Sequence, residues 1–209
     1  MTKEERYIRE NSSSVSEVLD WLERETNLRT NHARMLSGAI QGGLLQMISK
    51  MIQPDNILEI GTFTGYSAIC LASGLSKTGT LDALEKNDEL EPLIREAISR
   101  ANLASKITLH FGDAIEILPK LDKYYQLVFI DANKREYSAY FDLVVDKVPS
   151  GGIILADNVL WDGKVYQENV PTDAQTREIL SFNKKIKEDE RVENIILPLR
   201  DGINIIRKL

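Results

Sequence analysis

Two continuous apolar runs rich in β-branched residues most strongly constrain how this 209-residue chain can fold. The run LVFI covers residues 127–130, and the run IILA covers residues 153–156. An unbroken apolar run is typical of a strand buried on both faces, as in a parallel sheet covered by helices. We therefore expect an α/β fold whose central strands are parallel.

Strand-like and helix-like segments alternate from the Pro54-Asp55 turn onward, which predicts a doubly wound sheet. Near the end, Asp201-Gly202 between two β-rich runs predicts an antiparallel hairpin. The expected fold class is α/β, with a doubly wound, mostly parallel, seven-stranded sheet and an antiparallel C-terminal hairpin. The expected strands are 56–60, 80–85, 106–111, 125–131, 152–157, 192–199 and 202–208, and the expected helices between them are 65–75, 88–101, 114–120, 135–148 and 173–189.

The length of the chain fits a single domain, residues 1–209, with a substantial core. Residues 1–52 have helical patterns and predict an N-terminal helical extension, and residues 53–209 predict the α/β core. Ser14 and Glu17 have capping-box spacing, so a helix is expected to begin there.

Composition limits the class of partner. The chain is 43% hydrophobic and 28% charged, with a net charge of −6, which argues against a nucleic-acid surface without excluding a local basic patch. No apolar run reaches the roughly 18 residues that a membrane span needs, and the polar start MTKEERYIRE does not read as a signal peptide. The single cysteine, Cys70, is expected to be a buried thiol, consistent with a reducing cytoplasm.

Oxygen-bearing side chains directly follow both apolar runs: Asp131 after the first, and Asp157 with Asn158 after the second. In a parallel sheet, ligands bind beyond the carboxyl ends of the strands, so these three side chains are expected to gather at one place. Carboxylate and amide oxygens suit Mg²⁺, Ca²⁺ or Mn²⁺ better than zinc. Taken one at a time, the same residues also fit helix N-caps and turns.

The first half of the core predicts an adenosine-containing cofactor. Gly61 and Gly65 lie between a strand-like and a helix-like segment, where they allow a tight turn and a close approach of a ligand. Their G-x-x-x-G spacing is not the dinucleotide fingerprint, which argues against a nicotinamide dehydrogenase. Glu85 ends the next strand and suits ribose hydroxyls, or opens the next helix. Asp113 suits an adenine amino group, or caps a helix.

These motifs together resemble the metal-dependent class I O-methyltransferases of the caffeoyl-CoA and catechol O-methyltransferase family. The matching segments, LEIGTFTGYS, ALEKN, GDA, FIDANKREY, LADNVLWDGKV and LPLRDGINIIRKL, occur in the family's order within residues 35–209. The resemblance implies S-adenosylmethionine (SAM) as the methyl donor, a Rossmann-like class I fold and a homodimer. It also implies cofactor-binding roles for Glu59, Gly61, Gly65, Ser67, Glu85, Asp113, Ala114 and Asp131.

The same resemblance implies a divalent metal, most often Mg²⁺ with Mn²⁺ or Ca²⁺ as alternatives, ligated by Asp131, Asp157 and Asn158. Lys134 would be the catalytic base, because burial and a neighbouring cation disfavour the charged form of a lysine; its alternative is a solvated surface lysine. Methyl transfer from a sulfonium requires alignment and an ionised acceptor oxygen. A metal that chelates two vicinal hydroxyls favours their ionisation, so a catechol-like small molecule is the expected acceptor.

Other residues have weaker assignments. Trp161 and Tyr137 are expected to contact the acceptor, although each also fits a packing role. Asn133 occupies a position where relatives often have an acidic residue, and we expect this difference to tune the metal site rather than abolish it. Met35, Gly38 and Gln41 precede the first strand and would cover the cofactor, but Met35 fits the apolar face of a helix better.

Two other functions fit parts of the pattern. The first is a tRNA-modifying enzyme that methylates a hydroxylated uridine, since some relatives act on RNA; the acidic balance argues against it. The second is a non-catalytic module that binds SAM or drives oligomerisation, and the intact set of metal-ligand residues argues against it. The leading prediction is a SAM-dependent O-methyltransferase that acts on vicinal hydroxyls.

Overall fold

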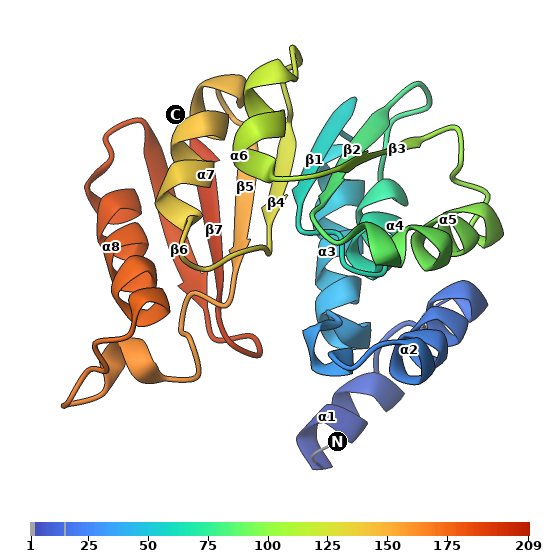
Figure 1. The fold of residues 1–209 in the computed structure, drawn as a ribbon, viewed down its shortest axis with the longest axis horizontal. Helices are drawn as coiled ribbons and strands as arrows, with labels where there is room; N and C mark the ends of the chain where they lie inside the picture. The colour runs from blue at the N-terminus through green and yellow to red at the C-terminus, as the bar shows by residue number, and fades with distance from the viewer. Residues whose placement is uncertain (1–2, 15) are drawn as a thin grey trace.

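The computed structural model describes residues 3–14 and 16–209, which form a sheet with helices on both faces (Figure 1). Residues 1, 2 and 15 of the predicted extension lie outside the described residues. The sheet has seven strands in the order β3-β2-β1-β4-β5-β7-β6. The strands are β1 (Asn56–Ile60), β2 (Thr80–Glu85), β3 (Ile107–Phe111), β4 (Leu127–Ile130), β5 (Ile153–Asp157), β6 (Val192–Leu197) and β7 (Ile203–Lys208).

Strands β1 to β5 pair in parallel, while β7 runs antiparallel to both β5 and β6. The register aligns Ile60 of β1 with Leu84 of β2 and with Ile130 of β4, so the carboxyl ends of the central strands lie at one edge. The predicted fold class is confirmed, including the closing hairpin. The expected strand boundaries agree with the observed ones to within two residues.

Helices bury both faces of the sheet, and two hydrophobic cores result. Because side chains alternate along a strand, Ile57 of β1 joins the first core and Leu58 the second. The first core contains side chains from α2 (Glu17–Arg29), α3 (Gly38–Ile52), α4 (Tyr66–Ala72) and α5 (Glu91–Arg100), and the second contains side chains from α6 (Ala114–Ile117), α7 (Tyr137–Val144) and α8 (Ala174–Glu188).

Several predicted helices are shorter than expected because 3₁₀ turns adjoin them. In the expected helix 114–120, Pro119 lacks a backbone N–H, and α6 gives way to a 3₁₀ turn at Leu118. The 3₁₀ turns are η1 (Ala33–Met35), η2 (Asp88–Leu90), η3 (Leu118–Lys120), η4 (Val145–Lys147) and η5 (Lys164–Tyr166).

The expected capping box at the start of α2 is wrong by two residues. Ser16, rather than Ser14, is the N-cap, and its hydroxyl oxygen accepts a hydrogen bond from Leu19 N at 3.4 Å. Glu17 therefore occupies the first helical position, two residues before the third position that a capping box requires.

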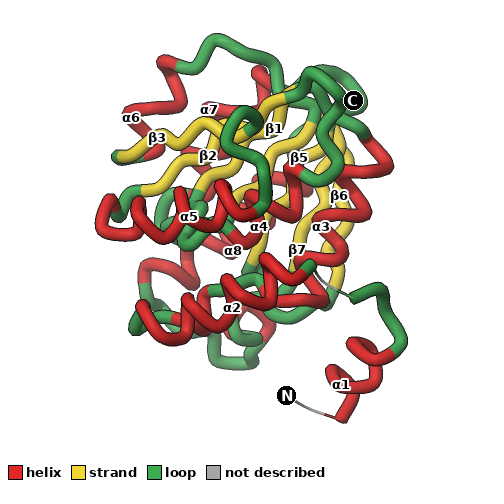
Figure 2. Tube along the Cα trace, turned by 90° about the vertical axis from the view of Figure 1, so that its right-hand side faces the viewer, coloured by secondary structure: helices red, strands yellow, loops and turns green. Residues whose placement is uncertain are grey.

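The first helix, α1 (Lys3–Glu10), extends away from the rest of the chain (Figure 2). It contacts α3, but none of its residues is buried. Cys70 is a free thiol within the first core, as predicted. None of the helices in residues 3–14 and 16–209 is long and apolar enough to cross a membrane.

Candidate functional site

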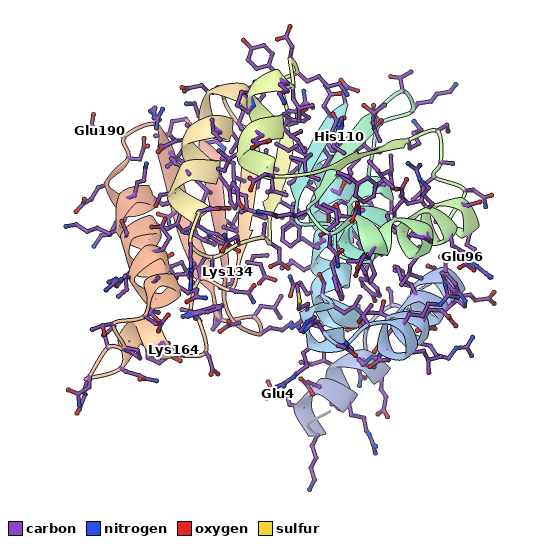
Figure 3. All side chains as sticks on the ribbon, viewed as in Figure 1. Glu4, Glu96, His110, Lys134, Lys164 and Glu190 are labelled. Carbon is purple, nitrogen blue, oxygen red and sulfur yellow. The ribbon has the colours of Figure 1, made fainter. Side chains whose placement is uncertain are left out.

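A cavity of about 680 Å³ lies beyond the carboxyl ends of the parallel strands. Lys134 lies near the start of α7, on the β4–β7 side of the molecule (Figure 3). Predicted site residues that line the cavity are Gly61, Ser67, Glu85, Asp113, Ala114, Asp131, Lys134, Asp157, Asn158 and Trp161. Glu59, Gly65 and Tyr137 lie outside its lining. The structure thus brings most of the predicted residues together from the ends of five strands, β1 to β5.

The turn after β1 depends on two glycines. Gly61 has φ +95°, and a Cβ on it would lie 2.1 Å from the carbonyl oxygen of Asp131. Its N–H donates to Leu84 O at 3.0 Å, so the turn is fixed against the end of β2 as well. Gly65 has φ +93° and is the N-cap of α4. A side chain at position 61 would push the ends of β1 and β4 apart.

Glu85 and Asp113 face the cavity from the ends of β2 and β3. Backbone N–H groups donate hydrogen bonds to both carboxylates. Glu85 accepts from Phe63 N at 2.6 Å and from Asn87 N at 2.8 Å. Asp113 is the N-cap of α6, and its second oxygen pairs with Lys86 Nζ at 2.7 Å. The hydrogen bond from Lys86, assisted by the backbone of α6, lowers the pKa of Asp113.

Glu59 is fully buried in β1, behind the glycine turn. Its Oε2 accepts a hydrogen bond from the Thr62 hydroxyl at 2.8 Å. Burial raises the pKa of this carboxyl to about 7, and the charges of Asp131 and Glu85 add to the rise. Glu59 is therefore poised between its charged and neutral forms near neutral pH, at the point where the two halves of the sheet meet.

Lys134 lies between two oxygen atoms at the start of α7. Its Nζ donates to Asp131 Oδ1 and to the hydroxyl oxygen of Tyr137, both at 2.7 Å. Tyr137 is fully buried, and its own hydroxyl donates to the carbonyl oxygen of Asp157 at 2.9 Å. Burial raises the pKa of Tyr137 well above its usual value, so the phenol remains a donor to that carbonyl. Tyr137 therefore supports Lys134 from below the cavity, which favours the packing alternative over acceptor contact.

Asp157 ends β5 with only 3% of its surface exposed. Burial and the nearby charge of Asp131 raise its pKa to about 6. Its Oδ1 accepts from Asn158 N at 2.8 Å, and its Oδ2 accepts from Gln41 Nε2 at 2.7 Å. Gln41 was predicted as a possible cofactor cover, but it lies behind Asp157 and does not line the cavity. Arg200, which donates to Gln41 Oε1 at 3.3 Å, had no sequence signal beyond the hairpin.

The segment after β5 is conformationally strained, because Asn158, Trp161 and Asp162 all have positive φ. Trp161 lines the cavity, and its buried indole N–H has no hydrogen-bond partner in the described part of the chain. Lys164 Nζ lies 5.3 Å from the centre of its ring. Met35 also lines the cavity with 57% of its surface exposed, so its expected place on an apolar helix face is wrong.

The donors around Asp131 and Asp157 suit a hard divalent cation. Within residues 3–14 and 16–209, no group of three or more His, Cys, Asp or Glu side chains could hold a metal ion. The predicted set differs because it combines two carboxylates with the Asn158 amide oxygen. The raised pKa of Asp157 shows that its negative charge is disfavoured beside Asp131. A bound cation would offset that repulsion, so these residues fit Mg²⁺, Mn²⁺ or Ca²⁺.

Comparisons with known proteins agree with the geometry. The profile of the O-methyltransferase family matches residues 9–209. Caffeoyl-CoA O-methyltransferase 2 of Petunia hybrida is 35% identical over 189 residues, which cover 84% of this chain and 77% of the relative. An SAH-bound methyltransferase of Podospora anserina is 27% identical, with a TM-score of 0.91 over 99% of this chain and 94% of its own.

The O-methyltransferase of Bacillus cereus, solved with SAH, is also 27% identical and has a TM-score of 0.89. That match covers 100% of this chain and 98% of the bacterial one. The fold, the strand-end cavity and the family profile all point the same way. This chain belongs to the O-methyltransferase family, as a SAM-dependent enzyme.

Proposed function

We propose that this enzyme transfers the methyl group of SAM to a hydroxyl of a catechol-like small molecule. One observation carries the proposal: Lys134 and the oxygen donors of Asp131, Asp157 and Asn158 line the same cavity. Relatives named caffeoyl-CoA O-methyltransferase support a small aromatic acceptor. The acceptor would bind on the β4–β5 side of the cavity, with Trp161 as one wall.

SAM would bind on the β1–β3 side. Glu85 would accept hydrogen bonds from the ribose hydroxyls with the lone pairs that its two backbone donors leave free. Asp113 and Ala114 would flank the adenine. The glycine turn and Ser67 would hold the methionine end, and the carboxyl of Glu59 lies just behind that turn. SAM bound in this way would direct its sulfonium methyl group toward the β4–β5 side, where Lys134 lies.

Lys134 would remove the proton of the acceptor hydroxyl. In its neutral form, Nζ takes that proton, and the acceptor oxygen then attacks the methyl group in line with the departing sulfur. The ammonium that forms is stabilised by two acceptors already in place, the Asp131 carboxylate and the Tyr137 oxygen, each 2.7 Å from Nζ. The Tyr137 hydroxyl donates to Asp157 O, which leaves its oxygen free to accept from Lys134.

Asp131, Asp157 and Asn158 would hold a divalent cation, with Mg²⁺ as the first candidate, because all three offer hard oxygen donors. When bound, the cation would supply Lewis acidity that favours ionisation of a chelating pair of vicinal hydroxyls. Two carboxylates formally balance the dication and the Asn158 amide adds no charge, so the loaded site would not carry a net negative charge that repels an anionic acceptor oxygen.

The test is production of SAH from SAM and caffeic acid, with Mg²⁺ and again with excess chelator. Turnover that requires Mg²⁺ supports the whole proposal. Turnover that is unaffected by chelator supports the methyltransferase activity but contradicts the role of the metal. No turnover, with SAM binding demonstrated by calorimetry, contradicts the catechol acceptor; unmodified and hydroxyuridine-containing tRNA would then be the next substrates to test.

We also propose that the protein is a homodimer that uses its N-terminal helices. An isolated helix of eight residues is marginal in water, yet α1 has no buried residue. Tyr7 on α1 and Met47 and Met51 on α3 are 68%, 61% and 74% exposed. A second copy would bury these apolar side chains. Light scattering on the full chain and on Tyr7→Glu tests this, and a monomeric full chain contradicts it.

A further inference from the structure

Three side chains from distant parts of the sequence form a hydrogen-bonded chain at the wall of the cavity, where Asp157 and Arg200 line it and Gln41 lies behind them. Gln41, in the first turn of α3, is 1% exposed and does not line the cavity. Its Nε2 donates to Asp157 Oδ2 at 2.7 Å, across 116 positions of sequence. Its Oε1 accepts from Arg200 Nη1 at 3.3 Å. Gln41 therefore reaches the cavity only through its two partners, Asp157 and Arg200, which both line it.

The chemistry of its neighbours fixes the orientation of the Gln41 amide. A guanidinium has only donors, and an ionised carboxylate has only acceptors. The amide oxygen must therefore face Arg200, and the amide nitrogen must face Asp157. Arg200 is itself held by the carbonyl oxygens of Leu36, at 2.8 Å, and Ser37, which immediately precede α3.

Both oxygens of Asp157 have a donor from the protein side. Oδ1 accepts from Asn158 N at 2.8 Å, and Oδ2 accepts from Gln41. Rotation of the carboxylate about its last bond would break both hydrogen bonds. Each oxygen keeps a second lone pair, and Asp157 lines the cavity, so these lone pairs are available to a ligand there.

We propose that Gln41, oriented by Arg200, is a positioning residue that fixes the Asp157 carboxylate for divalent-cation binding. The inference rests on the proposed function, because it assigns Asp157 to the metal. Partners of metal ligands orient those ligands, and their removal typically costs about 10–100-fold in metal affinity. Gln41 and Arg200 thereby link the start of α3 and the β6–β7 hairpin to the chemistry at the end of β5.

The test is Gln41→Met, which keeps the length of the side chain and removes its donor and acceptor. Binding of Mn²⁺ alone to the full chain, measured by the electron paramagnetic resonance of the free ion, is expected to weaken about 10–100-fold. SAM affinity, measured by calorimetry without metal, is expected to stay unchanged, because Gln41 lies outside the cavity. Gln46→Met is the matched control, since Gln46 is half-buried on the same helix and also outside the cavity; it is expected to bind Mn²⁺ normally.

The outcomes separate the inference from the proposed function. If the wild type binds Mn²⁺ and Gln41→Met binds it equally tightly, the positioning role is overturned and the metal site stands. If the wild type shows no saturable Mn²⁺ binding, the metal site itself fails, and the positioning role fails with it. If melting curves show that Gln41→Met does not fold, Arg200→Lys takes its place. That variant keeps the charge but not the forked donor, so Mn²⁺ affinity should fall about 2–10-fold, and an unchanged affinity overturns the inference.

Discussion

Two pairs of carboxylates face the cavity from opposite halves of the sheet. Glu85 and Asp113, at the ends of β2 and β3, accept hydrogen bonds from backbone N–H groups, and Lys86 lowers the pKa of Asp113. Asp131 and Asp157, after β4 and at the end of β5, lie close enough to repel each other. Burial, together with that repulsion, raises the pKa of Asp157 to about 6.

This difference suggests that the β2–β3 side serves cofactor binding and that the β4–β5 side serves the chemical step. On the β2–β3 side, the charged form of each carboxylate is stabilised by groups that the fold already supplies, so the surface is ready to accept polar hydroxyls. On the β4–β5 side, burial and the charge of Asp131 disfavour the negative charge of Asp157, which a bound cation or a proton would offset. A carboxyl group whose pKa is perturbed in this way within a cleft is a candidate for the site of reaction. The positive φ angles at Asn158, Trp161 and Asp162 fall on the same side.

The largest expected effect is loss of the base. Lys134→Met should lower kcat by about 10²–10⁴-fold, the usual contribution of a general base, and leave the Kd for SAM unchanged. Steady-state kinetics and calorimetry measure the two quantities. Lys187→Met, on the exposed face of α8, is the control and should behave as wild type. A rise in the Kd for SAM of the Lys134→Met variant would contradict the division between the two sides, because Lys134 would then contribute to cofactor binding as well as to chemistry.

The next effect concerns the contact that joins the halves. Gly61→Ala should destabilise the fold by about 3 kcal/mol or more, because its φ of +95° is unfavourable for alanine and the new Cβ would lie 2.1 Å from Asp131 O. Gly43→Ala is the matched control, since its Cβ would meet no atom within 4 Å on α3, and it should stabilise by about 0.5–1 kcal/mol. Urea unfolding measures both. Equal stability of Gly61→Ala and wild type would show that the two strand ends can separate freely.

Glu59 gives a pH-dependent test at the boundary between the halves. Its pKa is raised from 4.5 to about 7 in the folded protein, chiefly by burial, so the folded state holds the proton more tightly than the unfolded state. The contribution to stability is present below about pH 4.5 and is lost as pH rises toward 7. Relative to Glu59→Gln, the wild type should lose on the order of 3 kcal/mol across that window.

This prediction requires protein with chelator and without SAM, so that ligands do not contribute. Urea unfolding free energies of wild type and Glu59→Gln are compared at several pH values. Curves that run parallel from pH 4 to 8 would mean that Glu59 has the same pKa in the folded and unfolded states. The neighbours of Glu59 would then stabilise its carboxylate enough to offset burial. Glu59 would in that case resemble the hydrogen-bonded carboxylates of the β2–β3 side.

Much of the fold and the position of the site could be predicted from sequence because they follow from local patterns. The apolar runs predicted the central strands. Residues that come directly after parallel strands must lie at the carboxyl-terminal edge of the sheet. Asp131, Asp157 and Asn158 needed no further information than that. Asp201-Gly202 likewise predicted the closing hairpin, since turn chemistry is read within a few residues.

The remaining features depend on packing between distant segments. The Gln41–Asp157 hydrogen bond spans 116 positions, and no local pattern pairs a helical glutamine with a strand end. Tyr137 has the sequence position of a cavity residue, but its place in α7 turns it beneath Lys134. Met35 fits a helical apolar pattern, yet the chain there forms a 3₁₀ turn that exposes it. Tertiary context decided these three cases.

The smallest expected effect distinguishes two roles of Asp113, as helix cap and as cofactor contact. Asp113 Oδ1 accepts from Ile115 N at 2.9 Å, and asparagine caps helices as well as aspartate does. Asp113→Asn should therefore keep wild-type stability, whereas Asp113→Ala should lose about 1 kcal/mol. If Asp113 acts only as a cap, Asp113→Asn also keeps the wild-type Kd for SAM in calorimetry. A Kd that rises equally in both variants would mean that the Asp113 carboxylate contacts SAM directly. Asp113 would then bind the cofactor as well as cap α6.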